Sequence, residues 1–372
     1  MKRKILIEIG NPGNTFHQEM QSGRYELKQN MYRLKLKYWD EIYYISFGRD
    51  KNEDYKFDER IKILYNKNAY HSLIYAFLIP WLYRDVLSEA SVFMPKQLSC
   101  SLYGIYSKLF FRKKVVVHCG YNWQEPQRHA GKPWYYKAFV NFWCFITYKF
   151  SDAVIVTSDR HLKHAEMMTG KKNVFLLRNG VNTDLFKNLK IQRNSSTVLF
   201  VGRLEKEKNL FNLITATTLT KNKIILKIAG RGSLEKELKD HSAKLNAPVE
   251  FLGPLETGQL INNFYNRETM FVLPSFFEGH SNALTEAMAC GIPVIVSEAE
   301  GNTEIIKHEV NGLVSGFTPE KMAECIDRYI SNPDLKNRMA ENALAEVEEN
   351  YNLKKRIERE IEILKKFSVE KL

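Results

Sequence analysis

Leu273-Pro-Ser-Phe-Phe-Glu278-Gly-His-Ser-Asn-Ala-Leu-Thr-Glu286-Ala-Met-Ala-Cys-Gly291-Ile-Pro293 is the most informative part of this 372-residue chain. The apolar residues before Pro274 predict a buried strand, and the polar residues after it predict a loop. A helix is expected to begin near Ser281 or Asn282 and to end at Gly291, before the next strand. The pattern therefore predicts a strand–loop–helix–strand unit of a parallel α/β sheet.

Two glutamates in this unit are spaced for a ligand with several polar groups. A helix N-terminus at the carboxyl edge of a parallel sheet offers N–H groups and a positive dipole to an anion. Glu286, one turn into the helix, could hold both hydroxyls of a vicinal diol, and Glu278 in the loop could reach a second hydroxylated group. The pattern favours a ligand with sugar, phosphate and ribose in series. The alternative is a helix with ordinary charged residues after a glycine-rich turn.

Other polar residues also follow predicted strands. Arg203 and Lys208 could neutralise a diphosphate there, or could be solvated residues at a helix start. His118 could hydrogen-bond a reacting group, or be satisfied by backbone at a sheet edge. Gly13 lets the backbone approach a phosphate closely, or only makes a turn. His161 and His164 are expected on an exposed, lysine-rich helix face rather than at a metal ion.

The segment from Glu278 to Glu286 resembles the E-x7-E signature of the retaining glycosyltransferases of family 4, which have the two-Rossmann GT-B fold. Further matches follow in the family's order: Arg178-Asn-Gly-Val-Asn-Thr-Asp-Leu-Phe186, Val201-Gly-Arg203-Leu-Glu-Lys-Glu-Lys208-Asn, Ile228-Ala-Gly230-Arg-Gly232-Ser and Phe251-Leu-Gly253. The resemblance is dense over residues 150–320 and thin before them, as is usual where acceptors differ.

The resemblance implies how the second domain binds a nucleotide-sugar donor. It assigns the diphosphate to Arg203 and Lys208, so that no metal or other cofactor is expected, and the ribose to Glu286. It places the transferred sugar near Glu278. The remaining donor-binding positions are the loop and helix start Gly279, His280, Ser281 and Asn282.

The resemblance implies fewer residues in the first domain. It places His118 beside the transferred sugar, so that the expected catalytic set is His118, Glu278, Arg203 and Lys208. It places Gly13 near the donor diphosphate, although the family usually has a glycine pair where this chain has Gly13-Asn14.

The whole chain has the alternation expected of two such domains. Its length, at roughly 150 residues per domain, predicts two domains. Strands separated by helical stretches are predicted at Lys4–Ile9, Glu41–Ser46, Lys114–His118, Ala153–Thr157, Val174–Leu177, Thr197–Val201, Ile224–Ala229, Val249–Leu252, Met270–Leu273 and Pro293–Val296. The predicted class is α/β, GT-B, with two Rossmann-like domains facing each other across a cleft.

Domain boundaries follow from composition and periodicity. The polar stretch after Asn182 predicts a domain junction there, which divides the chain into domains over 1–182 and 183–349. The resemblance implies that the first domain binds the acceptor and the second binds the nucleotide sugar. An amphipathic helix over about 350–372 is expected to pack back on the first domain.

Cysteine usage and the N-terminus indicate a reducing, cytoplasmic location. The five cysteines include no C-x-x-C pair, and the apolar run before Gly10 is too short for a signal peptide. The apolar windows Leu73–Leu82 and Ala138–Phe150 are about half the ~20 residues needed to cross a bilayer. We expect both windows to be buried helices.

Charge is concentrated in the first half of the chain. Residues 1–190 contain 31 Lys and Arg against 17 Asp and Glu, a net charge of +14, whereas the complete chain carries +12. Lysines among aromatic residues between Tyr103 and Lys137 suit contact with an anionic membrane surface. A merely solvated basic face is the alternative. Nucleic acid is not expected as a partner because no recognition motif accompanies the charge.

The resemblance implies a retaining, metal-independent hexosyltransferase, and the charge pattern places it at the periphery of the inner face of the cell membrane. Its acceptor is expected to be a lipid-linked saccharide in bacterial surface-polysaccharide assembly. Three alternatives remain open from the sequence: a nucleotide-sugar epimerase on the same fold, a transferase with a soluble acceptor, and a non-catalytic nucleotide-binding membrane scaffold.

Overall fold

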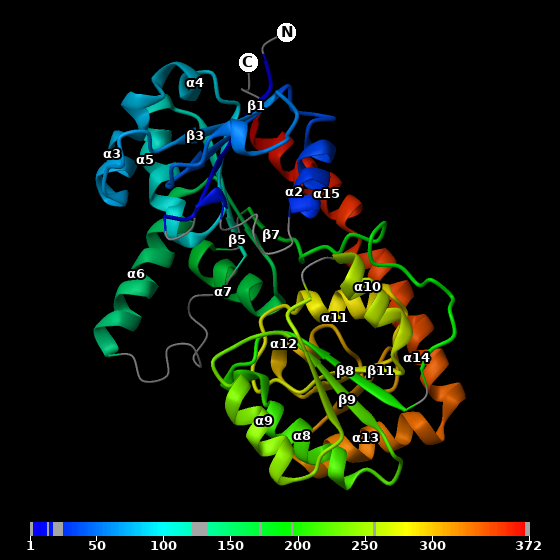
Figure 1. The fold of residues 1–372 in the computed structure, drawn as a ribbon. Helices are drawn as coiled ribbons and strands as arrows, with labels where there is room; N and C mark the ends of the chain where they lie inside the picture. Colours follow the sequence, from blue (N-terminus) through cyan, green and yellow to red (C-terminus); the bar gives the residue numbers. More distant parts are fainter. Residues whose placement is uncertain are drawn as a thin grey trace. The chain divides into compact units, whose positions relative to one another are not determined.

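The computed structural model describes residues 3–12, 15–17, 25–120, 133–170, 173–194, 196–255 and 258–368. The chain divides into two compact units, shown in Figure 1. The N-terminal unit comprises Met1–Arg178 with Lys354–Leu372, and the C-terminal unit comprises Asn179–Leu353.

The junction between the units lies after Arg178. The sequence analysis placed it four residues later, after Asn182. The backbone N–H of Val181 donates to the carbonyl of Tyr351 at 2.8 Å, and that of Leu353 donates to the carbonyl of Val181 at 2.9 Å. These two bonds join the first residues of the C-terminal unit to its last ones. Consequently residues 179–182 belong to the second unit.

The N-terminal unit is built on a parallel sheet. Its strands are ordered β3-β2-β1-β4-β5-β6-β7, and all the pairings are parallel. Their bounds are β1 (Ile5–Ile9), β2 (Glu41–Ser46), β3 (Ile61–Tyr65), β4 (Val92–Pro95), β5 (Lys114–Cys119), β6 (Ala153–Val156) and β7 (Val174–Leu176). The sequence analysis missed β3 and β4. Lys62 interrupts the first of these, and the second is four residues long and ends in a proline, which gives a weak strand signal.

Helices flank this sheet. They are α2 (Tyr25–Lys35), α3 (Ser72–Leu82), α4 (Arg84–Ser88), α5 (Ser101–Phe111), α6 (Trp134–Phe150), α7 (Asp159–Thr169) and α15 (Leu353–Ser368), with short 3-10 turns η1 (Asn52–Asp54) and η2 (Leu98–Cys100). Ile363 and Leu364 of α15 are buried in one core cluster with Leu6 and Trp39. The predicted return of the C-terminal helix to the first domain is therefore confirmed.

The prediction that Leu73–Leu82 and Ala138–Phe150 are buried helices was half wrong. Both segments are helical, in α3 and α6, and Tyr75 and Cys144 lie in the core. Each helix also turns large apolar side chains to solvent, including Phe77 at 59% exposure and Phe142 at 62%. Periodicity detects an apolar face only when polar residues occupy the opposite one, and here both faces are apolar.

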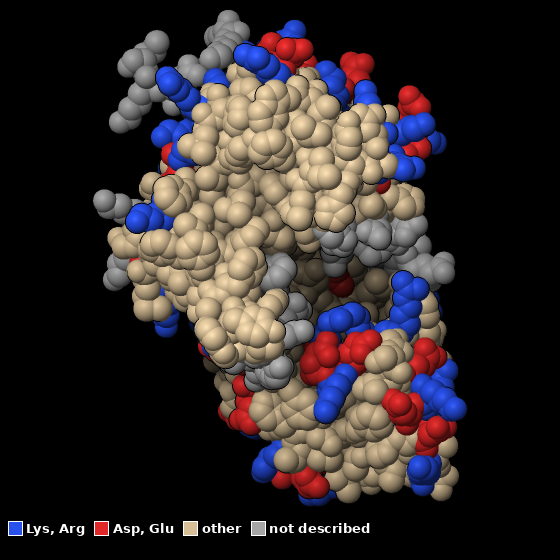
Figure 2. Space-filling model, turned by 90° about the vertical axis from the view of Figure 1, so that its left-hand side faces the viewer, with Lys and Arg blue, Asp and Glu red and all other residues tan. Residues whose placement is uncertain are grey.

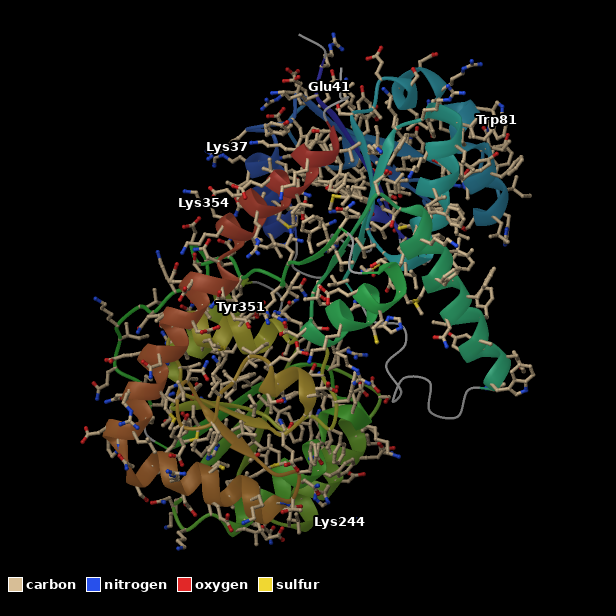
Figure 3. All side chains as sticks on the ribbon, turned by 180° about the vertical axis from the view of Figure 1, so that it is seen from behind. Lys37, Glu41, Trp81, Lys244, Tyr351 and Lys354 are labelled. Carbon is tan, nitrogen blue, oxygen red and sulfur yellow. The ribbon has the colours of Figure 1, made fainter. Side chains whose placement is uncertain are left out.

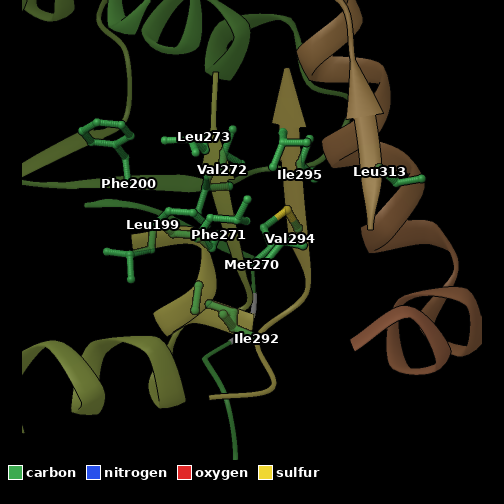
Figure 4. Close-up of a cluster of buried hydrophobic side chains, with 14 of the residues drawn as sticks. Leu199, Phe200, Met270, Phe271, Val272, Leu273, Ile292, Val294, Ile295 and Leu313 are labelled. Atoms are coloured by element: carbon green, nitrogen blue, oxygen red, sulfur yellow. The ribbon is translucent and has the colours of Figure 1, made fainter. Parts of the chain in front are cut away.

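The C-terminal unit contains a second parallel sheet, ordered β10-β9-β8-β11-β12-β13. Its strands are β8 (Thr197–Val201), β9 (Ile225–Ala229), β10 (Val249–Gly253), β11 (Met270–Leu273), β12 (Val294–Ser297) and β13 (Leu313–Ser315); the last was not predicted from sequence. Figure 4 shows apolar side chains of β8, β11 and β12, such as Leu199, Phe271 and Ile295, gathered in its core.

The helices of this unit are α8 (Leu210–Leu219), α9 (Glu235–Lys244), α10 (Gly258–Arg267), α11 (Asn282–Ala289), α12 (Glu300–Thr303), α13 (Pro319–Ser331) and α14 (Pro333–Glu346). A 3-10 turn, η3 (Lys206–Lys208), follows β8, and a π-helical turn, η4 (Val347–Tyr351), follows α14.

Both sheets reverse their strand order beside their first strand. In the C-terminal unit β8 pairs with β9 on one side and β11 on the other, and in the N-terminal unit β1 pairs with β2 and β4. In open parallel sheets, ligands bind beyond the carboxyl ends of strands at such a reversal. The loops after β8 and β11 are therefore the first place to look for a site.

Candidate functional site

The loops that follow β8 and β11 are held together by backbone and side-chain hydrogen bonds. The N–H of Phe276 donates to the carbonyl of Glu207 at 2.8 Å, and the Asn209 amide donates to the carbonyls of Pro274 and Phe317 at 3.2 and 3.0 Å. Asn209 has φ 55°, a left-handed conformation that asparagine tolerates better than most residues. These bonds fix the two loops against each other at the sheet reversal.

Lys208 and Glu278, predicted separately from sequence, form an ion pair across these loops. The side chain of Lys208 is 12% exposed and that of Glu278 is 10% exposed. The hydroxyl of Ser275 also donates to Glu278 Oε1, at 2.7 Å. Lys208 and Ser275 thus orient the Glu278 carboxylate together, and the Lys208 ammonium lies beyond the C-terminal ends of the strands.

Arg203 lies in the loop after β8 with its side chain 65% exposed. Its guanidinium Nη2 is 2.8 Å from Glu207 Oε1, within the same loop. An exposed ion pair of this kind contributes little to stability, so that Arg203 can leave Glu207 for an incoming anion at small cost.

Helix α11 begins where the sequence predicts. Ser281 is its N-cap, and the Ser281 hydroxyl accepts from the backbone N–H of Leu284 at 3.4 Å. The first-turn N–H groups of a helix have no partner within the helix, so that this end is suited to an anion. Gly279 and Asn282 flank the cap, while the ring of His280 packs beside that of Tyr351, with 5.5 Å between centroids.

Glu286 is half-buried one turn into α11. The Glu286 carboxylate lies near the hydroxyl of Tyr265. Burial first, and then this carboxylate, raise the pKa of the Tyr265 hydroxyl well above its ordinary value. Tyr265 also donates to the carbonyl of Ala283 at 3.1 Å. Tyr265 therefore contacts the first turn of α11 and lies close to Glu286.

Two glycines outside the predicted set shape this region. A Cβ on Gly301, in α12, would lie 2.2 Å from the carbonyl oxygen of Glu278 and 2.4 Å from that of Gly279. A Cβ on Gly230 would lie 1.8 Å from the carbonyl oxygen of Gly202, at φ +150°. Only glycine fits at either place. The Gly230-x-Gly232 turn was visible in the sequence, but Gly301 carried no local signal.

In the N-terminal unit, His118 lies near the end of β5 and contacts the C-terminal helix. Its Nε2 is 3.2 Å from the Arg356 Nη2 of α15. A guanidinium can only donate, so Nε2 must accept and the imidazole proton must reside on Nδ1. Burial and then the Arg356 charge lower the pKa of His118 to about 3. His118 is consequently a neutral imidazole with Nδ1–H as its donor.

Beneath His118 lies a buried cluster of charges that the sequence analysis missed, called here the ion cluster: Glu8, Lys35, Lys96, Arg356 and Glu360. Lys35 Nζ lies 2.6 Å from Glu8 Oε1 and 2.5 Å from Glu360 Oε1. Lys96 Nζ lies 3.0 Å from Glu8, and Arg356 Nη1 lies 2.7 Å from Glu360. The signal available in the sequence was Glu8, an acid inside an otherwise apolar strand.

Two further predictions concern Gly13 and the histidines of α7. Gly13 lies outside the described residues. His161 is not exposed as expected: it is buried at 2%, and its Nε2 lies 2.6 Å from the Tyr148 hydroxyl. Within the described ranges, no group of three or more His, Cys, Asp or Glu side chains is placed to hold a metal ion.

The fold defined by these two sheets is GT-B. The structure superposes on sucrose-phosphate synthase from Thermosynechococcus elongatus with a TM-score of 0.76, covering 98% of this chain and 99% of that one at 15% identity. It superposes on Anabaena HepE, solved in complex with UDP, with a TM-score of 0.74, covering 98% and 100% at 17% identity.

Residues 181–346 match the family model of glycosyl transferases group 1. The C-terminal unit therefore contains a glycosyl transferases group 1 domain, at the place where the sequence motifs are densest.

Two curated relatives that this chain resembles are also named as glycosyltransferases. An uncharacterized glycosyltransferase of Methanocaldococcus jannaschii is 35% identical over 171 residues, covering 45% of this chain and 44% of the relative. The Escherichia coli UDP-Gal:alpha-D-GlcNAc-diphosphoundecaprenol alpha-1,3-galactosyltransferase is 27% identical over 219 residues, covering 54% and 56%. The chain thus spans about half the length of these two relatives.

Proposed function

We propose that this protein is a retaining, metal-independent hexosyltransferase that uses a nucleotide-diphosphate sugar. The observation that carries the proposal is the pairing of Lys208 with Glu278 at the reversal of the C-terminal sheet. A diphosphate bound there would meet the ammonium of Lys208, the exposed guanidinium of Arg203 and the first turn of α11. Glu286, one turn further along α11, is then positioned for the ribose hydroxyls.

The donor residues act by charge stabilisation and positioning. As the bond between the anomeric carbon and the diphosphate oxygen breaks, negative charge grows on the leaving group, and Arg203 and Lys208 stabilise it. Glu278, released from Lys208 by the incoming phosphate, can accept hydrogen bonds from the sugar hydroxyls. The acceptor oxygen bonds to the same face of the anomeric carbon, and its proton passes to the departing phosphate. This route retains the anomeric configuration.

His118 is assigned to the transferred sugar or to the acceptor hydroxyl. Its Nδ1–H donates, because Nε2 accepts from Arg356. A neutral donor can hold a hydroxyl in place without protonating it. This role rests on the resemblance to family 4 and on the protonation state of the ring.

The proposed acceptor is a lipid-linked saccharide of cell-surface polysaccharide assembly, used at the inner face of the cell membrane. Two observations support this finer assignment. The Escherichia coli relative is named for an acceptor on diphosphoundecaprenol. The first 190 residues of this chain carry a net charge of +14, which attracts anionic lipids and lipid diphosphates.

A thermal-shift panel of UDP, GDP and ADP tests donor binding before any acceptor is known. One nucleotide should raise the melting temperature selectively, and Glu286→Ala should reduce that shift because the ribose contact is lost. Glu358→Ala, on the exposed face of α15, is the matched control. Transfer from the matching sugar nucleotide, measured with EDTA present, then tests metal independence. The absence of any nucleotide-dependent shift would refute the proposal.

A further inference from the structure

The N-terminal unit exposes a continuous apolar surface made by three neighbouring helices, called here the apolar face. It consists of the large solvent-exposed apolar side chains of α3, α5 and α6. Among the most exposed are Phe77 and Trp81 of α3, Leu109 of α5, and Phe139 and Phe142 of α6, with exposures from 48% to 74%. Single exposed apolar residues are ordinary, but a contiguous group of this kind marks a surface that meets a partner.

Contacts between the helices show that α5 adjoins both α3 and α6, and that the exposed rings of α3 and α5 form one cluster. Phe77 of α3 stacks on Tyr106 of α5 with centroids 5.6 Å apart, and Trp81 meets Phe110 at 4.9 Å. On the other side of α5, Ser101 Oγ lies 2.6 Å from Thr147 Oγ1 of α6. Figure 3 shows Trp81 at the outer edge of the N-terminal unit. The aromatic rings of α3 and α5 are therefore already packed together while remaining open to solvent.

The charges on these helices are of one sign. In sequence, α3, α5 and α6 contain three lysines and no aspartate or glutamate. Arg112, which ends α5, and Lys149 in α6 are exposed, and the Lys149 ammonium lies 5.1 Å from the Phe145 ring. In Figure 2 this side of the N-terminal unit is a broad area without charged side chains, and both basic and acidic side chains lie at its upper margin. A partner must therefore accept apolar rings and supply negative charge.

We propose that the apolar face docks on an anionic phospholipid membrane, with its rings in the interfacial layer and its cations at the headgroups. Trp and Tyr side chains favour that layer because one end is apolar and the other polar. Lysine stems lie along apolar surface while their ammonium groups reach the phosphates. Among the described residues, no helix is both long and apolar enough to cross a bilayer, so the contact is a surface one.

A second copy of the chain is the main rival occupant, and the charge pattern disfavours it. A twofold interface brings the same patch of both copies together. Here the cations of one copy, Arg112 and Lys149 among them, would face the same patch of the other copy, whose three helices supply no carboxylate to pair with them. A lipid surface supplies the missing negative charge.

Co-sedimentation of the full chain with vesicles tests the proposal without nucleotide or acceptor, so its outcome is separate from that of the proposed function. The protein should pellet with vesicles of phosphatidylcholine and phosphatidylglycerol, and much less with phosphatidylcholine alone or at high salt. The double variants Phe77→Ser/Trp81→Ser and Phe139→Ser/Phe142→Ser should each reduce partitioning roughly tenfold or more. Lys149→Glu, which leaves every ring in place, should reduce it about fivefold.

The matched control changes exposed apolar residues of the other unit. Leu219→Ser/Val310→Ser, at 46% and 51% exposure, should partition as the wild type does. Circular dichroism checks that each variant is folded, and should a serine variant unfold, Lys149→Glu still decides the matter. Equal recovery with neutral and anionic vesicles, no recovery with either, or equal loss in the control variant would overturn the proposal. So would a dimer in sedimentation velocity that Phe77→Ser/Trp81→Ser abolishes.

Discussion

Lys208 and Glu278 illustrate how one contact serves two states of a site. Without a donor, each satisfies the charge of the other in a place where neither is more than 12% exposed. In the proposed mechanism a diphosphate replaces Glu278 as the partner of Lys208, which frees the carboxylate for sugar hydroxyls. The pair therefore orients both groups before the proposed donor arrives.

Lys208→Ala should lower kcat/KM for transfer by about 100-fold, because one of two cations at the leaving group is lost. Arg203→Ala combined with Lys208→Ala should abolish transfer. Initial rates with saturating acceptor provide the measurement. Lys239→Ala, which breaks an exposed pair with Glu235 on α9, is the control and should leave the rate unchanged. Wild-type turnover in the double variant would show that the diphosphate binds elsewhere.

His118 should not titrate near neutral pH. Its pKa of about 3 lies far below the ordinary histidine value, because of burial and then Arg356. The ring is therefore neutral from about pH 5 upwards. The pH profile of kcat/KM should therefore contain no step near neutrality that His118→Asn removes. His118→Asn, whose amide can replace Nδ1–H, should also keep more activity than His118→Gln. The reverse order would place the working proton on Nε2.

Individual site residues were predictable where they follow strands in a recognisable motif. Lys208, Glu278 and Ser281 lie where sequence placed them, since a strand end and a helix cap are local features. Gly301 and Arg356 were not predictable, because each acts on a residue distant in the chain: Glu278 for the glycine and His118 for the arginine.

At the scale of elements, the C-terminal helix α15 is tied to the N-terminal sheet by charge as well as by apolar packing. Glu360 is fully buried and lies between Lys35 of α2 and Arg356 of its own helix. Such a cluster depends on all its members, because an unpaired charge in a buried place is costly. The helix thus supports both the sheet and the position of His118.

Glu360→Gln should lower the free energy of unfolding by about 3 kcal/mol, because it leaves Lys35 and Arg356 with one buried carboxylate fewer. Urea denaturation followed by circular dichroism is the measurement. Glu358→Gln, exposed on the same helix, should change stability by less than about 0.5 kcal/mol. Equal effects of the two substitutions would mean that the cluster does not anchor α15.

The ion cluster also predicts a loss of stability in acid. Burial alone would raise the pKa of Glu8, but Lys35 and Lys96 outweigh it and lower the pKa from 4.5 to about 2. A carboxyl whose pKa is lower in the folded than in the unfolded state stabilises the fold at pH values above its unfolded-state pKa. For Glu8 this stabilisation is lost as the pH falls from 4.5 to about 2. Denaturation midpoints should fall over this interval in the wild type and fall less in Glu8→Gln. A parallel fall in both would contradict the assignment.

Elements were predictable where pattern and burial agree. Thr197–Val201 and Met270–Leu273 were placed to the residue, because apolar strands between loops give a clear signal. Helices α3 and α6 were found, but their exposure was not, since an apolar residue looks the same in sequence whether it faces the core or a partner. Exposure is a property of packing.

At the scale of the whole molecule, the two units contain different functional features. The N-terminal unit holds His118, the ion cluster and the apolar face. The C-terminal unit contains the loops after β8 and β11, joined by Lys208 and Glu278, and the residues that match the glycosyl transferases group 1 model. The overall α/β class with two parallel sheets followed from sequence alternation, because each strand–helix repeat is short and local.

The central claim is that a nucleoside diphosphate binds at the reversal of the C-terminal sheet. A crystal structure with the nucleotide selected by the thermal-shift panel tests it most directly. We expect the diphosphate against Arg203, Lys208 and the start of α11, with both ribose hydroxyls on Glu286. Nucleotide bound at another place, or a ribose that does not touch Glu286, would contradict the account.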